Sequence, residues 1–241
     1  MVSVWGLTDK GIVRRENQDS CAYEAVENGT AWGIVCDGMG GAAAGDIASD
    51  LAVETFRQHI TQPIQPEEDP GQKLIDAALA ANQMVYQRAR SDLNCLGMGT
   101  TLVSLFLREQ ALWVVNVGDS RAYHITKDTI QRITRDHSVV EELVEQGQLT
   151  REEARRHPRR NLITRALGTS KDVKADLFQR HVEPGDALLL CSDGLINEVT
   201  DQEIQEEILA GGTTEAICRR LMDRALSYGA PDNVTIVLFQ L

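Results

Sequence analysis

The sequence lacks the cysteine pairs that mark disulfide-rich proteins and structural zinc sites. It has five cysteines, an odd number, and no two of them form a Cys-x-x-Cys pair. Four of the five lie inside apolar or helical patterns, which favours buried free thiols over disulfides. We therefore expect a reducing compartment and a cytoplasmic protein. The five positions are Cys21, Cys36, Cys95, Cys191 and Cys218.

The chain also lacks a hydrophobic run long enough to cross a bilayer. Its longest apolar runs, such as ALLLC at 187–191, are far shorter than the roughly 20 residues that a spanning helix needs. The N-terminus, MVSVWGLTDKGIV, contains no apolar signal-peptide core. These absences predict a protein without a membrane partner.

Positive charge is scarce, and this excludes duplex nucleic acid as a partner. The formal net charge is −12, whereas binding to nucleic acid needs a basic surface. An acidic balance instead fits a protein that holds several cations in a carboxylate-lined site. The length of 241 residues permits two small domains but also suits one large domain, and 42% hydrophobic residues is normal for a globular protein.

Apolar periodicity predicts groups of strands and groups of helices. Strand patterns occur at 2–7, 20–26, 30–36, 100–109, 111–125, 128–134, 173–182, 186–194 and 233–241. Helical patterns occur at 42–60, 73–89 and 214–227, and capping signals predict shorter helices after Ser138, Thr150 and Thr200. The strand patterns between 100 and 134 indicate an antiparallel meander. Because like elements are grouped, we predict a single α+β domain over 1–241 with largely antiparallel sheets.

Five aspartates stand at the ends of the predicted strands. Asp37, Asp119 and Asp193 end the apolar runs IVCDG, VVNVGD and LLLCSDG, and Asp19 and Asp232 precede strands. A carboxylate beside an apolar interior is costly to desolvate unless a positive charge lies next to it. The same motifs contain no lysine or histidine partner at the strand end. Hard oxygen ligands of this kind indicate Mg²⁺ or Mn²⁺.

Two other interpretations of the stretch IVCDGMGGAAAGDIASD are weaker. Asp-Gly is a common hairpin signal, but the pattern becomes helical after both Asp-Gly pairs. Gly38, Gly40 and Ala43 match a dinucleotide-binding fingerprint, yet the acidic residue expected about 20 residues later is missing. Asp37 would also repel a pyrophosphate, and no Walker Gly-Lys-Ser/Thr sequence follows.

Two further features have ordinary structural interpretations. Cys218 and Arg224 have the spacing of the tyrosine-phosphatase signature, but they lie in an amphipathic helical pattern. That chemistry needs a glycine-containing loop at a helix N-terminus. The arginine cluster RRHPRR at 155–160 is interpreted as a solvated helical face and turn rather than as a docking site.

Five segments carry a resemblance to a known family. They are GLTDKGIVRRENQD (6–19), VCDGMGG (35–41), NVGDSRAY (116–123), LLLCSDGL (188–195) and APDNVTIVL (230–238). In this order they resemble the signature segments of the metal-dependent serine/threonine protein phosphatases, type 2C, of the bacterial kind. The resemblance implies a four-layer α-β-β-α sandwich of two antiparallel sheets flanked by helices. It also implies a flap subdomain at about 134–168.

The same resemblance implies a role for each metal-site residue. Asp37 would bridge two metal ions, and the Gly38 carbonyl would be a further ligand. Asp193 and Asp232 would complete the first metal. Asp19 would hold metal-bound waters.

Two more roles follow from the resemblance, and the physical chemistry agrees with them. Asp119, together with Asp193, would form a third metal site, and Arg14 would hold the substrate phosphate. An acidic pocket can bind an anionic phosphomonoester only through cations. Two ions lower the pKa of a bridging water, which then attacks phosphorus without a covalent enzyme intermediate. The glycines at 38, 40 and 41 would bend the chain and bring a carbonyl to a metal.

One position departs from the family pattern. Many members carry a histidine, proposed as the general acid, directly after the DGMGG segment, and here that position is Ala42. Nothing in the sequence brings another histidine to the metals. We therefore expect a metal-bound water to protonate the leaving group. The available histidines are His59, His124, His137, His157 and His181.

The sequence thus predicts a monomeric cytoplasmic phosphatase that removes phosphate from phosphoserine and phosphothreonine in proteins. Its partners would be Ser/Thr kinases or their substrates, with no nucleic acid or membrane. Two alternatives stay open: a binding module or pseudophosphatase marked by Ala42, and a hydrolase of small phosphate esters. The five retained aspartates argue against the first, and the polar segment 134–168 favours protein substrates over the second.

Overall fold

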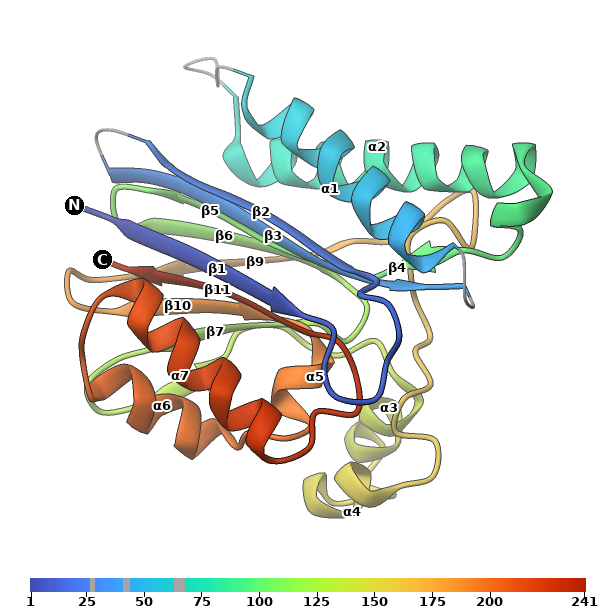
Figure 1. Cartoon of the computed structure of the whole chain (residues 1–241). Helices are drawn as coiled ribbons and strands as arrows, with labels where there is room; N and C mark the ends of the chain where they lie inside the picture. Colours follow the sequence, from blue (N-terminus) through green and yellow to red (C-terminus); the bar gives the residue numbers. More distant parts are fainter. Residues whose placement is uncertain (27–28, 41–43, 63–67) are drawn as a thin grey trace.

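The protein forms two antiparallel sheets that pack face to face between two layers of helices (Figure 1). The computed structural model describes residues 1–26, 29–40, 44–62 and 68–241. All strand pairings in this part of the chain are antiparallel. The predicted α+β class and the four-layer sandwich are therefore confirmed.

The first sheet joins the two ends of the chain. In spatial order it contains β1 (Ser3–Asp9), β11 (Val234–Gln240), β10 (Ala187–Cys191), β7 (Arg121–Ile125) and β8 (Ile130–Arg132). The last strand of the sequence thus lies beside the first, and the residues that flank the two strands meet at one edge of the sandwich.

The second sheet contains four strands from the first half of the chain and one strand from the second half. In spatial order these are β2 (Asp19–Val26), β3 (Thr30–Met39), β5 (Leu102–Arg108), β6 (Ala111–Val117) and β9 (Asp176–His181). The short β4 (Gly99–Thr100) pairs with the end of β3. This added pairing extends β3 beyond its predicted end, so that the strand includes the aspartate at position 37.

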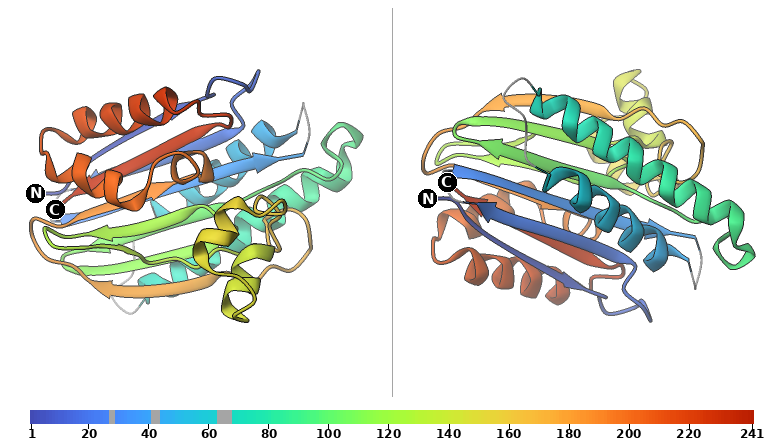
Figure 2. Two further views of the ribbon diagram at one scale, coloured as in Figure 1. Left: turned by 90° about the horizontal axis from the view of Figure 1, so that it is seen from below. Right: turned by 90° about the horizontal axis from the view of Figure 1, so that it is seen from above.

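Helices cover the outer face of each sheet (Figure 2). α1 (Gly45–Ile60) and α2 (Pro70–Ser91) pack on the second sheet, followed by a 3-10 turn at Leu93–Cys95. α5 (Asp193–Ile196), α6 (Asp201–Leu209) and α7 (Thr214–Ser227) pack on the first sheet. α3 (Val139–Glu145) and α4 (Arg151–Arg156) lie outside the sandwich, at one end of it (Figure 1).

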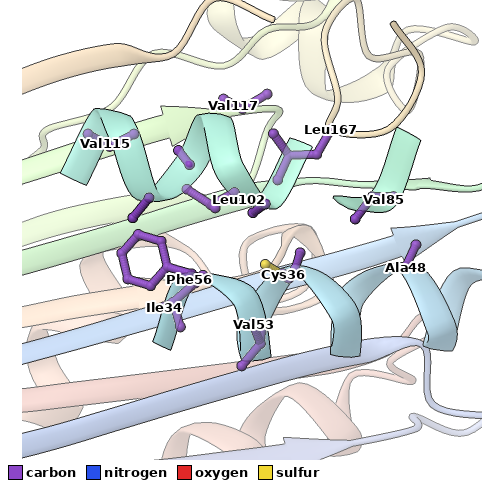
Figure 3. Close-up of a cluster of buried hydrophobic side chains, with 14 of the residues drawn as sticks. Ile34, Cys36, Ala48, Val53, Phe56, Val85, Leu102, Val115, Val117 and Leu167 are labelled. Carbon is purple, nitrogen blue, oxygen red and sulfur yellow. The ribbon is translucent and has the colours of Figure 1, made fainter. Parts of the chain in front are cut away.

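Alternation along the strands divides the apolar side chains among three cores. In β3, Ile34 and Cys36 face the helices, where they join Phe56 of α1 in the cluster of Figure 3. Val35, on the opposite face, packs between the two sheets with Phe239 of β11. Because successive side chains of a strand point to opposite faces, a single buried strand contributes to two cores.

The predicted meander is wrong in one respect. β5 and β6 form a hairpin in the second sheet, whereas β7 and β8 form a hairpin in the first. The chain crosses between the sheets at Gly118, Asp119 and Ser120, with Gly118 in a positive-φ conformation (φ 111°). A local strand pattern cannot indicate this change of sheet, because it depends on which partner strands are available.

The predicted helices are present, with shifted ends in several cases. α7 spans the predicted residues, and capping boxes begin α4 at Thr150 and α6 at Thr200. α2 begins at Pro70 rather than Lys73, because Asp69 caps it. The predicted helix from 42 is described from Gly45 onward. The helical pattern expected after Gly194 is present as the short α5, which is separate from α6.

The structure bears on two predictions, one about disulfide bonds and one about membrane-spanning helices. All five cysteines are free thiols, and all except Cys21 are buried. Within the residues that the structure describes, no helix combines the length and apolar character needed to span a membrane.

The spacing between the sheets depends on Gly33 in β3. A β-carbon there would lie 2.6 Å from the Phe239 ring, which is fully buried. We expect Gly33→Ala to lower the free energy of unfolding by about 1–3 kcal/mol, as overpacked core substitutions do. Urea denaturation would measure this. Shortening the ring in a Gly33→Ala/Phe239→Leu double variant should recover part of the loss, whereas strictly additive losses would contradict the steric explanation.

Candidate metal centre

Two of the aspartates face each other across neighbouring strands. In the antiparallel register of β2 and β3, Asp19 lies opposite Asp37. The backbone of Asp37 is held by two consecutive threonines: its N–H donates to Thr101 Oγ1 (2.9 Å), and its carbonyl accepts from Thr101 N (2.9 Å) and from Thr100 Oγ1 (2.9 Å). The pairing of strands therefore fixes two carboxylates side by side at one sheet edge.

Asp19 lies deepest and connects the two sheets. Its Oδ2 accepts hydrogen bonds from Ser192 Oγ and Thr235 Oγ1, each at 2.7 Å. The Thr235 hydroxyl also contacts the Thr8 hydroxyl at 2.7 Å. Asp19 Oδ1 is buried and has no hydrogen-bond partner in the described part of the protein. One oxygen of this carboxylate is thus fixed by the fold, and the other is left for a ligand.

The glycines near Asp37 are explained by close backbone approach. A β-carbon at Gly38 would lie 2.0 Å from the Gly45 carbonyl oxygen and 2.5 Å from that of Gln18. Gly40 has a φ of 144°. β3 continues through Gly38 to Met39, so of the described glycines predicted to bend the chain it is Gly40 that lies at the bend. Gly41 and Ala42 lie outside the described residues.

Asp193 and Asp232 meet where β10 ends and β11 begins. Asp193 is the first residue of α5; its Oδ2 accepts from Asn197 Nδ2 (3.0 Å), and its buried Oδ1 has no partner among the described residues. The adjacent Gly194 is required, because a β-carbon there would lie 2.0 Å from the Asn233 carbonyl oxygen. Asp232 Oδ2 accepts from Arg14 Nη2 at 2.8 Å.

Asn233 positions the loop that carries Arg14. Its side-chain oxygen accepts from Gln18 N, and its amide donates to the carbonyls of Lys10 and Glu16, all at 2.9 Å. These three bonds hold the loop at both ends. The half-exposed Arg14 guanidinium therefore lies at the mouth of the site rather than free in solvent.

Asp119 approaches the same place from the crossover between the sheets. The preceding Gly118 N–H donates to His137 Nδ1 (3.0 Å), and its carbonyl accepts from His137 N (2.9 Å). The following Ser120 hydroxyl contacts the Thr101 hydroxyl at 2.7 Å. Thr101 thereby links the backbone of Asp37 to the crossover that carries Asp119.

A cavity of about 630 Å³ brings most of these residues together. Asp19 is not part of its lining but lies opposite Asp37 in the strand register. Asn161 and Ile163, from beyond α4, form part of its wall. The predicted site residues in its lining are Arg14, Asp37, Gly38, Asp119, Asp193 and Asp232.

Burial and mutual repulsion raise the pKa values of these carboxyl groups. Desolvation is the largest cause at all four groups: it raises the pKa of Asp19 to about 7 against hydrogen bonds from Thr235 and Ser192, and that of Asp193 to about 6. Desolvation, and then the charge of Asp19, raise the pKa of Asp37 well above its usual range. Desolvation, and then Asp193, do the same for Asp119. The cluster therefore favours additional positive charge.

The donor set fits hard divalent cations. Carboxylate oxygens and a main-chain carbonyl are the ligands that Mg²⁺ and Mn²⁺ prefer, and two buried carboxylate oxygens here lack partners. In the described part of the chain, no three acidic, histidine or cysteine side chains converge into a ready-made ligand group. The aspartates face an open cavity, which suits ions that keep several water ligands.

The histidines do not contribute to this cavity within the described residues. His137 is buried, where its Nδ1 accepts from Gly118 and its Nε2 contacts Asp176 (3.1 Å), and desolvation lowers its pKa. His124 contacts Asp186 (2.7 Å), and His181 contacts Glu183 (3.0 Å). His59 bonds to the carbonyl of its own helix at Thr55 (2.8 Å). His157 Nδ1 accepts from the backbone of the flap turn.

Sequence reasoning missed the polar residues that hold the aspartates. These residues lie within or beside strands, or next to the predicted aspartates, and all except the exposed Thr8 are buried. A polar residue within or beside an apolar run was the available signal. The residues that hold the aspartates are Thr8, Thr100, Thr101, Ser120, Ser192, Asn233 and Thr235.

Comparison with known proteins places the chain in a family. The model of the protein phosphatase 2C family matches residues 13–232. The serine/threonine phosphatase Stp of Listeria innocua is 36% identical over 97% of this chain and 93% of its own length. PstP of Mycobacterium tuberculosis is 38% identical over 96% of this chain, which spans 43% of that longer protein.

Solved structures agree with this assignment. Stp1 from Staphylococcus aureus superimposes with a TM-score of 0.94 at 37% identity, covering 100% of this chain and 95% of the other. The catalytic domain of PstP in complex with two manganese ions gives a TM-score of 0.87 at 35% identity, covering 99% and 97%. On the strength of its sequence, its sandwich and its aspartate-lined cavity, the chain belongs to the protein phosphatase 2C family.

Proposed function

We propose that this protein hydrolyses phosphoserine and phosphothreonine in other proteins with the help of Mn²⁺ or Mg²⁺ ions. The observation that carries the proposal is that four strand-end aspartates line one cavity together with Arg14, while the fifth, Asp19, lies opposite Asp37 in the strand register. Four of the five have raised pKa values. The names of the family relatives, which are serine/threonine phosphatases, support the reaction type.

The proposed ligand sets use the chain's own oxygen atoms. Asp37 would bridge two ions, with the Gly38 carbonyl, Asp193 and Asp232 as further ligands. Asp19, whose buried Oδ1 has no hydrogen-bond partner among the described residues, would orient ion-bound waters. Asp119, together with Asp193, would hold a third ion. When bound, the ions supply positive charge for the phosphate and lower the pKa of the attacking water.

The residues of the cavity favour direct attack by water. Its described lining contains no serine, cysteine or histidine side chain, and the Thr101 hydroxyl is held by the backbone N–H of Asp37 and by the Ser120 hydroxyl. The aspartates, which could otherwise form a phosphoenzyme, would be occupied by the ions. Arg14 is paired with Asp232 at 2.8 Å, and cations bound to Asp232 would release the guanidinium for the phosphate oxygens. A planar guanidinium suits bidentate binding of phosphate. Since His137 is occupied structurally, the leaving alcohol would take its proton from water.

The surroundings of the cavity support a protein substrate. The flap segment (134–168) supplies Asn161 and Ile163 to the cavity wall, and we propose that it acts as a subdomain of the single catalytic domain. The substrates would then be products of Ser/Thr kinases, or the kinases themselves, in cytoplasmic signal transduction. The protein would act as a monomer.

A first test is phosphate release from a phosphothreonine peptide. Mn²⁺-loaded protein should release phosphate, and excess EDTA should abolish release. Asp193→Asn should lower kcat/KM about a hundredfold or more, because it removes a ligand and weakens ion binding. Asp172→Asn, which removes an exposed carboxylate remote from the cavity, is the matched control and should retain full activity.

The same assay separates the alternatives. No release by folded, Mn²⁺-loaded protein from either the peptide or an aryl phosphate would favour a binding module. Release from the aryl phosphate alone would favour a hydrolase of small esters.

A second test uses stability rather than activity. The raised pKa values of Asp19 (about 7) and Asp193 (about 6) mean that the folded, metal-free protein binds more protons than the unfolded chain between about pH 4 and pH 7. The stability that the protonated Asp19 and Asp193 carboxyl groups contribute to the metal-free protein is therefore present at low pH and is lost as pH rises through this window. Differential scanning calorimetry with EDTA should show this loss. Mn²⁺ should raise Tm most at about pH 7.5, where the carboxylates are ionised. An equal Mn²⁺ effect at all pH values would contradict the assignment.

A further inference from the structure

The arginine-rich part of the flap segment contrasts with the rest of the protein. Residues 151–160 contain five arginines and two glutamates, in a chain of net charge −12. The structure separates these arginines into different environments. Arg156 pairs with Glu152 at 3.5 Å, and Arg159 is exposed and lines none of the three cavities around the metal centre. These two fit the solvated surface expected from the sequence.

Arg155 and Arg160 have a different position. Both are exposed, as Arg159 is, and both line a larger cavity of about 780 Å³ that also contains Asp136, Glu141 and Glu152. In addition, both line a second cavity of about 380 Å³, which lies directly beside the metal cavity. The two cavities share Arg14, Asn161 and Asp232 in their walls. The second cavity is thus adjacent to the predicted phosphate site, and its volume is sufficient for a side chain of a bound peptide.

The second cavity carries unneutralised positive charge. In the described part of the chain, the Arg155 and Arg160 side chains make no ion pair and no hydrogen bond, unlike Arg132, which binds Asp136 (3.2 Å) and Glu141 (2.7 Å). Three arginines line the cavity against two carboxylates, Glu198 and Asp232, and Asp232 already pairs with Arg14. An arginine fork without a partner in a concave surface is suited to a carboxylate or a phosphate.

We propose that Arg155 and Arg160 form an anion subsite that binds a second negatively charged residue of the substrate, close in sequence to the phosphoserine or phosphothreonine. The substrate class would be acidic or multiply phosphorylated peptides. This inference rests on the proposed phosphatase function, because the subsite selects among substrates of the same centre.

The chain geometry limits where the second charge lies. Asn161 lines both cavities and directly follows Arg160, so their α-carbons are about 3.8 Å apart. An extended peptide advances about 3.3 Å per residue. The anionic residue should therefore lie within about three residues of the scissile phosphoresidue.

The experiment compares kcat/KM for phosphothreonine peptides of one sequence. One peptide has neutral flanks, a second series carries glutamate at one position up to three residues on either side, and a third carries a non-hydrolysable phosphonate analogue of phosphoserine at the same positions. Only the phosphothreonine can release phosphate in each peptide. We expect the best glutamate peptide to exceed the neutral one about threefold, and the phosphonate peptide about tenfold, because doubly charged oxygens bind guanidinium more strongly.

Variants assign the preference to the two arginines. In Arg155→Ala/Arg160→Ala the ratio of anionic to neutral peptide should fall close to one. Arg159→Ala removes one positive charge from the same cluster but outside the second cavity, and it should keep the wild-type ratio, whereas Arg155→Ala and Arg160→Ala as single variants should each lower it. Arg155→Lys/Arg160→Lys should keep the glutamate preference and lose part of the phosphonate preference, because lysine has no fork. A merely structural role of the arginines would change all peptides alike.

The outcomes distinguish this inference from the proposed function. If Mn²⁺-loaded wild type releases no phosphate from any peptide, the phosphatase function fails. If it hydrolyses neutral and anionic peptides equally well, the subsite is disproved while the phosphatase function stands. A preference that survives in Arg155→Ala/Arg160→Ala would also disprove the subsite, and would assign the selectivity to another basic group.

Discussion

Repulsion among aspartates at one edge of the sandwich is the constraint on which the site depends. The fold brings five carboxylates to this edge, although burial and like charge raise the pKa values of four of them, Asp19, Asp37, Asp119 and Asp193. It tolerates them because hydroxyl groups and backbone amides fix their positions, as Ser192 and Thr235 do for Asp19. Because the carboxylates cannot move apart, they repel one another when ionised. Bound cations would relieve this repulsion, and the relief would favour cation binding.

The sequence indicated the cluster of repelling aspartates because each of them belongs to a short motif that is recognisable on its own. An apolar run that ends in aspartate is visible without knowledge of the fold, and so are the capping boxes of α4 and α6. Residue chemistry then identified hard cations as the partners. The order of motifs added the fold through the family resemblance. What could be predicted was therefore which residues are expensive to bury and what would neutralise them.

The parts that could not be predicted depend on pairing between distant segments. The change of sheet at Gly118 is invisible in a strand pattern, since β6 and β7 look like one hairpin. Thr101 holds Asp37 only because β4 pairs with the end of β3. Gly38 appeared to mark a bend, yet the structure requires glycine there because two other backbone segments approach it. Each of these features needs a three-dimensional neighbour to be defined.

The arginines of the flap segment carry the same charge but lie in different structural environments. By sequence alone, Arg155, Arg159 and Arg160 are equivalent members of one basic cluster. In the structure, only the first and last border a cavity beside the metal centre. An acidic centre attracts cations but repels anionic proteins at a distance, and a net charge of −12 strengthens that repulsion. Basic groups at the mouth of the centre would counter this repulsion where a phosphoprotein approaches. The acidic interior and the arginines at its rim would then act on successive stages of one binding event.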